Sequence, residues 1–168
     1  MKPKTSVLSK NTLILLTGSN QEQPIKQIGL AHRLIERRIG SVRRTSKLYK
    51  TKAWGNENQP PFINQALCIE TILPPRLCLK RCLEIEASMG RQRIKKWEPR
   101  IIDIDIIFYN AHILNSKELS IPHPHVQDRN FALACLDNII PSFIHPVFKQ
   151  SIHALMLKCT DTLKVVEL

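Results

Sequence analysis

The sequence predicts an α+β fold of the ferredoxin-like, split βαβ kind: an antiparallel sheet with helices packed on it, plus an irregular C-terminal extension. The apolar pattern reads, in order, as strand, helix, strand, strand, helix and strand, which is the element order of that arrangement. The length of 168 residues fits one domain. We therefore expect residues 1–168 to form a single domain, with residues 1–11 as a loose N-terminal tail.

The first half of the chain supplies three of the predicted strands and one helix. Residues 12–17 form a short apolar run typical of a buried central strand, and the turn residues 18–20 end it. Apolar side chains recur at helical spacing over residues 25–35, which predicts an amphipathic helix ending near the glycine at position 40. Residues 42–50 indicate a polar strand. Residues 62–71 alternate in the way of a third strand.

The second half continues with a helix and the last strand. A loop over residues 51–61 precedes the third strand, and residues 74–90 predict a helix that begins at a proline pair and ends at a glycine. Residues 101–109 are strongly strand-forming. A helix of roughly ten residues is expected from Asp128, and a short one over residues 151–158.

Composition limits the partners without choosing among them. The chain carries 25 Lys and Arg against 14 Asp and Glu, a net charge of +11, which favours nucleic acid, an anionic surface or a polyphosphate substrate. No apolar run is long enough to span a membrane, and the N-terminal run is too short for a signal peptide, so we expect a soluble, cytoplasmic protein. The five cysteines are expected to be reduced. Cys78 and Cys82 have the spacing for a shared metal, but they lack a partner pair.

Two aspartates on the last predicted strand are the sharpest chemical signal. Asp103 and Asp105 are separated by one residue, so their carboxylates point to the same side about 7 Å apart along the chain. Like charges this close on an apolar strand are costly unless a cation lies between them. Magnesium bound together with substrate phosphates fits such a pair. A plainly solvated polar face at a sheet edge is the alternative.

A basic loop directly precedes these aspartates. Arg91, Arg93 and Arg100 can bind phosphate oxygens with their guanidinium groups, while the neighbouring lysines fit a solvated loop equally well. Basic side chains beside an acidic, metal-binding strand are what a nucleoside triphosphate requires. The sequence therefore favours a site for a magnesium–nucleotide complex.

Weaker signals lie elsewhere in the chain. Glu86 stands at the border of the inward helix face, so it is either a carboxylate of the site or an ordinary border residue. Phe62 and Asn64 share a strand face and can bind a flat heterocycle, or they can be a core residue and its neighbour. A zinc site at His123 and His125 is disfavoured because prolines intervene and no third ligand is apparent.

Taken in order, these motifs resemble the 6-hydroxymethyl-7,8-dihydropterin pyrophosphokinase family. The resemblance runs from about residue 13 to about residue 146 and is most specific around the aspartates. It rests on Gly18-Ser19-Asn20, Phe62-Ile63-Asn64, Glu86 with Gly90-Arg91-x-Arg93, Trp97-x-Pro99-Arg100-x-x-Asp103-x-Asp105, and Pro122-His123 with Arg129-x-Phe131.

The resemblance implies a role for each matching residue in transferring pyrophosphate from ATP to the pterin. The residues implied in catalysis are Arg91, Arg100, Asp103 and Asp105, of which the two aspartates would bind two Mg²⁺ ions. The residues implied in ATP binding are Arg93, Trp97, His123, Arg129 and Glu86. The residues implied in pterin binding are Thr51, Trp54, Phe62, Asn64, Phe131 and Asn20. The loops at residues 51–61 and 91–96 match segments that close over the site in that family.

Two departures and two alternatives accompany the resemblance. The residues Lys52-Ala53-Trp54 replace the usual proline pair, and Glu98 replaces a glycine, so altered substrate affinity is expected. A basic RNA-binding domain is the main rival, although the aspartates would repel a phosphate backbone. An inactive pterin-binding relative is the other. On the favoured interpretation the partners are ATP and the pterin, with no nucleic acid or membrane, and the protein is a monomer.

Overall fold

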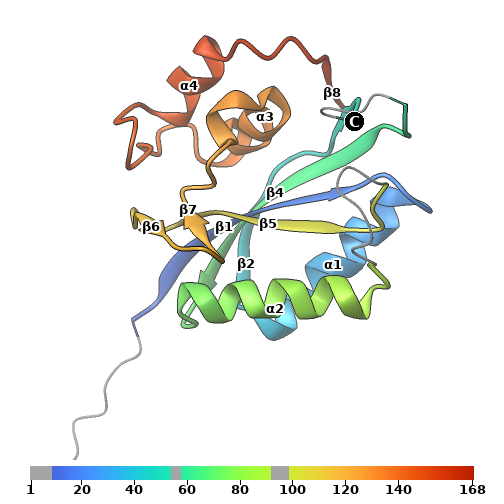
Figure 1. Cartoon of the computed structure of the whole chain (residues 1–168), viewed down its shortest axis with the longest axis horizontal. Helices are drawn as coiled ribbons and strands as arrows, with labels where there is room; N and C mark the ends of the chain where they lie inside the picture. The colour runs from blue at the N-terminus through green and yellow to red at the C-terminus, as the bar shows by residue number, and fades with distance from the viewer. Residues whose placement is uncertain (1–8, 54–57, 92–98) are drawn as a thin grey trace, which may run out of the picture.

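The computed structural model describes residues 9–53, 58–91 and 99–168 and shows a twisted antiparallel sheet with helices on both faces (Figure 1). The strands are β1 (Asn11–Ser19), β2 (Ser41–Thr45), β3 (Tyr49–Thr51), β4 (Phe62–Thr71), β5 (Asp103–Tyr109), β6 (Leu114–Asn115), β7 (Ser120–Ile121) and β8 (Val165–Glu167). The helices are α1 (Pro24–Arg38), α2 (Pro75–Ser88), α3 (Asn130–Ile139) and α4 (Ile152–Lys158), and a 3₁₀ turn spans Val126–Asp128. The predicted combination of an antiparallel sheet with helices is confirmed.

The strand order places β1 and β4 at the centre of the sheet. The main sheet runs β5-β1-β4-β3-β8, and β2 also pairs with β4. The two strands joined through α1, β1 and β2, have β4 between them, and the two joined through α2, β4 and β5, have β1 between them. The more specific ferredoxin-like assignment stays a prediction. β6 and β7 form a separate two-stranded ribbon.

Helices α1 and α2 cover one face of the sheet. Alternate residues of the central strands, including Leu13 and Leu15, point to this side, where they pack with Ile28 and Ile35 of α1. Cys82 of α2 is also fully buried there, so this thiol is a small apolar core residue in the structure. The predicted helical spacing of α1 thus corresponds to its buried stripe.

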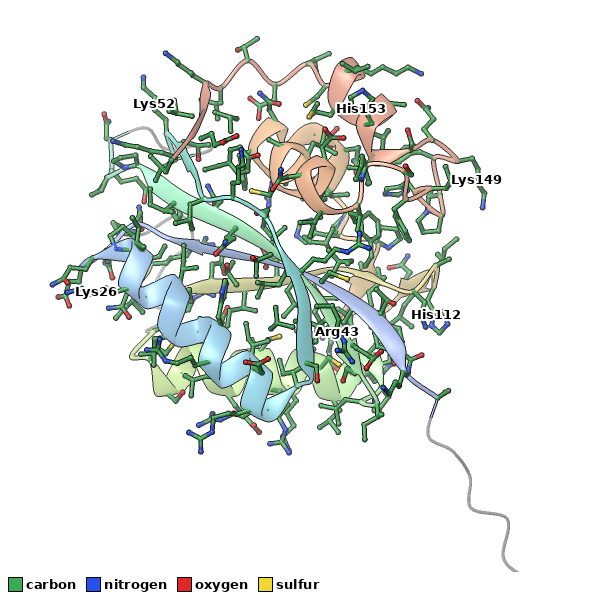
Figure 2. The ribbon with its side chains drawn as sticks, turned by 180° about the vertical axis from the view of Figure 1, so that it is seen from behind. Lys26, Arg43, Lys52, His112, Lys149 and His153 are labelled. Atoms are coloured by element: carbon green, nitrogen blue, oxygen red, sulfur yellow. The ribbon has the colours of Figure 1, made fainter. Side chains whose placement is uncertain are left out.

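Helices α3 and α4 cover the opposite face. Ile14 and Leu16 of β1, together with Ala66 of β4, pack against Leu133 and Leu136 of α3. Figure 2 shows the two layers from behind, with Lys26 on α1 on one side of the sheet and His153 on α4 on the other. The two helices predicted for the C-terminal extension are thus present, and they form the second layer of the core.

Three other boundaries differ from the sequence prediction. The strand predicted over residues 42–50 is divided into β2 and β3, because Ser46 turns inward and exchanges hydrogen bonds with Ala66 at 2.9 Å in each direction. β8 was not predicted, and it adds to the edge of β3. β1 begins at Asn11, so the expected tail ends at residue 10; residues 1–8 lie outside the described residues. Within the described ranges, no helix has the length and apolar character needed to cross a membrane.

Candidate active site

The polar residues singled out by the sequence meet at one end of the central strands. Asp103 of β5 and Asn64 of β4 are both register partners of Gly18 on β1, one on each side of it. Asp105 is in turn the partner of Leu16, whose side chain belongs to the core beneath α3. Register partners on neighbouring strands share a face. The carboxylates and the amide therefore lie on the α3 side of the sheet, at the edge of that core.

Gly18 allows these side chains to lie over the middle strand. A Cβ atom at this position would be 2.9 Å from Asn64 Oδ1 and 3.6 Å from Phe62 Cδ1. Any larger residue would push the Asn64 amide and the Phe62 ring away from β1. The Gly-Ser-Asn turn, weak as a sequence motif, thus has a steric role beside the acidic strand.

Arginines bind both carboxylate oxygens of Asp103. Arg91 donates to Asp103 Oδ1 at 2.5 Å, and Arg100 donates to Asp103 Oδ2. The Arg91 side chain is 11% exposed and that of Arg100 is 30% exposed, so both guanidinium groups lie at the border between protein and solvent. Two of the predicted phosphate-binding arginines are thereby placed directly beside the predicted metal ligand.

Glu86 lies beneath this pair rather than at the surface of the site. It is 2% exposed, accepts a hydrogen bond from Arg91, and accepts another from the Ile104 backbone N–H at 2.8 Å. The carboxylate therefore joins α2, the start of the basic loop and β5. Sequence reasoning left Glu86 open between a site residue and a border residue. Its burial and its contacts indicate that it positions Arg91.

Asp105 has a strongly raised pKa. Burial raises its pKa from 3.8 to about 7, and the negative charge of Asp103 acts in the same direction. The positive charges of Arg129 and Arg100 lower the pKa and only partly compensate. An ionised Asp105 is thus held at a cost, which a nearby cation would relieve.

Arg129 and His123 enter the site from the segment before α3. Burial lowers the pKa of Arg129, and the Asp105 and Asp103 carboxylates raise it. Burial, followed by the charge of Arg129, lowers the pKa of His123 to about 4, so its ring is neutral near pH 7. His123 Nδ1 accepts from the His125 backbone N–H at 3.2 Å. Its proton therefore resides on Nε2, which can donate to an anionic oxygen.

Asn20 fastens two loops to the end of β1. Its Oδ1 accepts from the Arg100 backbone N–H at 2.7 Å, and its own backbone N–H donates to the Arg100 carbonyl at 3.1 Å. Its Nδ2 donates to Gln59 Oε1 and to the Pro60 carbonyl, both at 3.0 Å. The side chain is buried, and protein groups use both ends of its amide. These contacts show that Asn20 positions both loops, and its role in pterin binding stays a prediction.

The other residues expected around the pterin lie on β3, β4 and α3. Asn64 is 4% exposed and donates to Thr51 Oγ1 at 3.1 Å, so Thr51 fixes the orientation of the amide. Phe62 is partly exposed at the start of β4, and Phe131 is partly buried in the first turn of α3, against the core beneath it. Trp54, Arg93 and Trp97 lie outside the described residues.

The acidic cluster fits a metal that is shared with a substrate. Among the residues that the structure describes, no group of three or more His, Cys, Asp or Glu side chains is arranged to hold a metal ion. Two carboxylates alone give too few ligands for a metal held only by the protein, but Mg²⁺ normally keeps waters and takes substrate phosphate oxygens as further ligands. Burial, followed by the charge of Asp103, raises the pKa of Asp105, so a cation beside it would favour its ionised form. This donor set fits a magnesium–nucleotide complex better than a structural metal.

The comparison with known families decides the assignment. The sequence matches the family of 7,8-dihydro-6-hydroxymethylpterin-pyrophosphokinase (HPPK) over residues 14–141, a segment that holds every candidate residue named above. The chain belongs to this family. Its members use ATP together with metal ions. The resemblance drawn from the motifs is therefore confirmed at the level of the family.

Individual HPPK relatives agree along the chain. The 2-amino-4-hydroxy-6-hydroxymethyldihydropteridine pyrophosphokinase of Aquifex aeolicus is 36% identical over 153 residues, which cover 91% of this chain and 94% of the relative. The enzyme of the same name from Haemophilus influenzae is 32% identical, over 80% of this chain and 85% of the relative. The folic acid synthesis protein fol1 of Pneumocystis carinii is 36% identical over 96% of this chain, which spans only 22% of that protein.

Solved structures share the fold. A crystal structure of Plasmodium falciparum HPPK-DHPS superposes with a TM-score of 0.75 at 21% identity, over 92% of this chain and 45% of that one. A second HPPK-DHPS structure, in complex with substrates, gives a TM-score of 0.73 at 18% identity, over 89% and 43% of the two chains. The chain thus spans less than half of these larger proteins. At such identities the superposition supports the architecture alone.

Proposed function

We propose that this protein transfers pyrophosphate from ATP to the hydroxymethyl group of 6-hydroxymethyl-7,8-dihydropterin, giving the pterin diphosphate and AMP, in folate biosynthesis. The observation that carries the proposal is the cluster of Asp103, Asp105, Arg91 and Arg100 beside Asn64, in a chain of the HPPK family. The site thus has two halves. The charged half, with the aspartates and arginines, is suited to a triphosphate, and it adjoins a second half that presents an aromatic ring and an amide. Both substrates can be bound within reach of each other.

The charged half supports nucleotide binding. Arg91 and Arg100 are held beside Asp103, and His123 is neutral with a proton on Nε2, so three donor side chains adjoin the aspartates, and the two arginines can reach phosphate oxygens by exchanging their contacts with Asp103. Guanidinium groups bind phosphates in a fixed geometry and stabilise charge that develops during transfer. We assign Arg129 to the same half because its charge acts on both aspartates. Glu86 positions Arg91 from below.

Metal binding is assigned to Asp103 and Asp105. Two Mg²⁺ ions shared with the ATP phosphates would neutralise their charge and draw electron density from the phosphorus that is attacked. The protein supplies the two carboxylates on one strand face, and the buried Glu86 beneath them keeps β5 in place through the Ile104 N–H. Arg100 can leave Asp103 for a phosphate oxygen without unfolding the site, because its backbone stays fastened to Asn20.

The other half supports pterin binding. Asn64 presents an amide whose orientation Thr51 fixes, and such an amide can pair with the donor and acceptor edge of a flat heterocycle. We propose that the rings of Phe62 and Phe131 stack on the two faces of the pterin, in the offset geometry that aromatic groups prefer. Gly18 leaves room for the amide and for Phe62 above β1.

The chemical step is an in-line displacement at the β-phosphorus of ATP. The pterin hydroxyl oxygen forms a bond to that phosphorus, the bond from it to the oxygen bridging the α- and β-phosphates breaks, and AMP leaves with the bonding electrons. The hydroxyl proton passes to solvent. No side chain of the described residues is placed as a strong base, so positioning and charge stabilisation supply most of the acceleration.

The direct test mixes the purified protein with ATP, Mg²⁺ and 6-hydroxymethyl-7,8-dihydropterin and follows AMP by chromatography. One AMP per pterin diphosphate, dependent on Mg²⁺, is the expected result. Folded protein that forms no AMP above background over a wide range of substrate concentrations would contradict the proposal. Binding of the pterin without turnover would then indicate an inactive relative. The monomeric state and cytoplasmic location stay predictions, which sedimentation and cell fractionation would check.

A further inference from the structure

The helix that carries Phe131 is capped by a residue far along the chain. α3 begins at Asn130, and the preceding residue, Arg129, provides no side-chain cap. Instead, Asp161 Oδ2 accepts a hydrogen bond from the Asn130 backbone N–H at 3.0 Å. A carboxylate at this position accepts from one of the four free N–H groups of the first turn, and its negative charge interacts favourably with the positive end of the helix dipole. Asp161 thus stabilises the first turn, in which Phe131 is the second residue.

The segment that contains Asp161 also forms hydrogen bonds within itself and with Asn130. Asp161 Oδ1 accepts from the Leu163 backbone N–H at 3.0 Å, and Asn130 Nδ2 donates to the Leu163 carbonyl at 3.3 Å. Residues 161–163 therefore form a small hydrogen-bonded loop closed on the start of α3. This loop leads directly into β8.

β8 in turn pairs with the strand that supports Asn64. In the antiparallel pairing of β8 with β3, Val165 is the register partner of Thr51. Thr51 is the residue that accepts from Asn64 Nδ2, and it is also the register partner of Phe62 on β4. Figure 1 shows the C-terminal segment running from α4 across α3 to β8 at the edge of the sheet. At the far end of β8, Leu168 N donates to the Leu48 carbonyl at 3.0 Å.

We propose that residues 161–167, here called the C-terminal strap, position the two sides of the pterin site relative to each other. One end of the strap caps the helix turn that carries Phe131, and the other end extends the sheet beside Thr51, Asn64 and Phe62. The proposal rests on the assignment of these residues to the pterin. It assigns no contact between the strap and either substrate, so Asp161 is a positioning residue.

The strap should affect the pterin more than the nucleotide. Asp103 and Asp105 lie on β5, and Glu86 of α2 contacts Arg91; among the described residues, neither β5 nor α2 pairs with the strap. Arg129, which we assign to the nucleotide side, directly precedes the capped turn. A loosened strap therefore raises the KM for the pterin strongly and the KM for ATP only slightly.

The test compares three single variants in the AMP-release assay. Asp161→Ala removes both acceptor oxygens, whereas Asp161→Asn keeps one oxygen that can accept from the Asn130 N–H and loses the acceptor for the Leu163 N–H. Asp137→Ala is the matched control: it removes another α3-region carboxylate contact, to His153 at 3.0 Å, near the other end of the same helix. We expect Asp161→Ala to raise the pterin KM roughly fivefold, the loss typical of one helix cap, with an ATP KM within about twofold of wild type.

The expected pattern is that Asp137→Ala keeps the wild-type pterin KM and that Asp161→Asn raises it less than Asp161→Ala does, because Asn retains one of the two acceptors. A chain that ends after Lys164, and so lacks β8, should show the same selective rise as Asp161→Ala. If that chain does not fold, the point variants decide alone. Equal changes in the two KM values, or no change in Asp161→Ala, would overturn the proposal. An inactive wild-type protein would instead refute the proposed function, so the two failures are distinguishable.

Discussion

Replacing Asp105 with Asn should stabilise the metal-free protein at alkaline pH while abolishing its activity. Burial and the charge of Asp103 raise the pKa of Asp105 from 3.8 to about 7. Between these two pH values Asp105 is therefore protonated in the folded protein and already ionised in the unfolded chain. The free energy of unfolding must therefore fall as the pH rises from about 4 to about 7, and stay lowered above that. Asn carries no charge, so the free energy of unfolding of the variant does not fall in this way as the pH rises.

The size of the effect follows from the two pKa values. One pH unit corresponds to about 1.4 kcal/mol, so the full difference is an upper limit of about 4 kcal/mol. Solvent reaches part of the side chain and screens its charge. We therefore expect Asp105→Asn to be more stable than wild type by about 2 kcal/mol at pH 8, with the difference vanishing near pH 4.

Urea unfolding in EDTA at several pH values between 4 and 8 measures this difference directly. A second series with Mg²⁺ and a non-hydrolysable ATP analogue should stabilise wild type more than Asp105→Asn, because the variant lacks one of the two carboxylates assigned to the metal. Parallel stability–pH profiles for the two proteins would refute the argument that Asp105 is held at a cost. Wild-type turnover in the variant would refute its assignment as a metal ligand.

Three further substitutions test the neighbouring contacts. Gly18→Ala should raise the pterin KM roughly tenfold, since the new methyl would meet Asn64 Oδ1 at 2.9 Å and Phe62 Cδ1 at 3.6 Å; an unchanged KM would contradict the steric role. Asn20→Ala should lower the free energy of unfolding by about 2 kcal/mol and lower kcat, because it leaves the Arg100 N–H unpaired; urea unfolding and turnover check both. Glu86→Gln should keep the Ile104 hydrogen bond and the fold but reduce kcat roughly tenfold, as Arg91 loses an ionic partner; normal kcat would remove Glu86 from the site.

Local sequence patterns were sufficient to predict the elements whose own residues determine their conformation. The alternation of Phe62–Thr71 corresponds to β4 without an error in its bounds, because the strand is central and both of its faces are buried. β8 was missed because three residues of weak pattern become a strand only through pairing with β3, more than a hundred positions away. The division of β2 from β3 likewise depends on Ser46 reaching Ala66 on another strand.

The residues of the candidate site divide in the same way, into those identifiable from the local sequence and those whose roles depend on distant contacts. The aspartates and arginines were identifiable because one strand and the adjoining loop contain them, and their charges are unusual in that setting. The roles of Asn20 and Glu86 could not be identified from the sequence, because each role depends on contacts that join three separate segments at one side chain. The spacing of Glu86 along the apolar stripe of α2 was the available signal. A carboxylate that extends such a stripe indicates burial, and burial requires a partner.

The arrangement of charges explains how one small cluster can be stable and still bind a triphosphate. Three carboxylates, Glu86, Asp103 and Asp105, adjoin three arginines, so the protein balances its own charges. A carboxylate with both oxygens on guanidinium groups is a poor cation ligand, and an arginine bound to a carboxylate is a poor phosphate ligand. On the proposed assignment, phosphate and cation together would remove both obstacles: the arginines would exchange a carboxylate for a phosphate, and the freed carboxylate would exchange an arginine for a metal. The geometry therefore favours simultaneous binding of nucleotide and metal over the binding of either one alone.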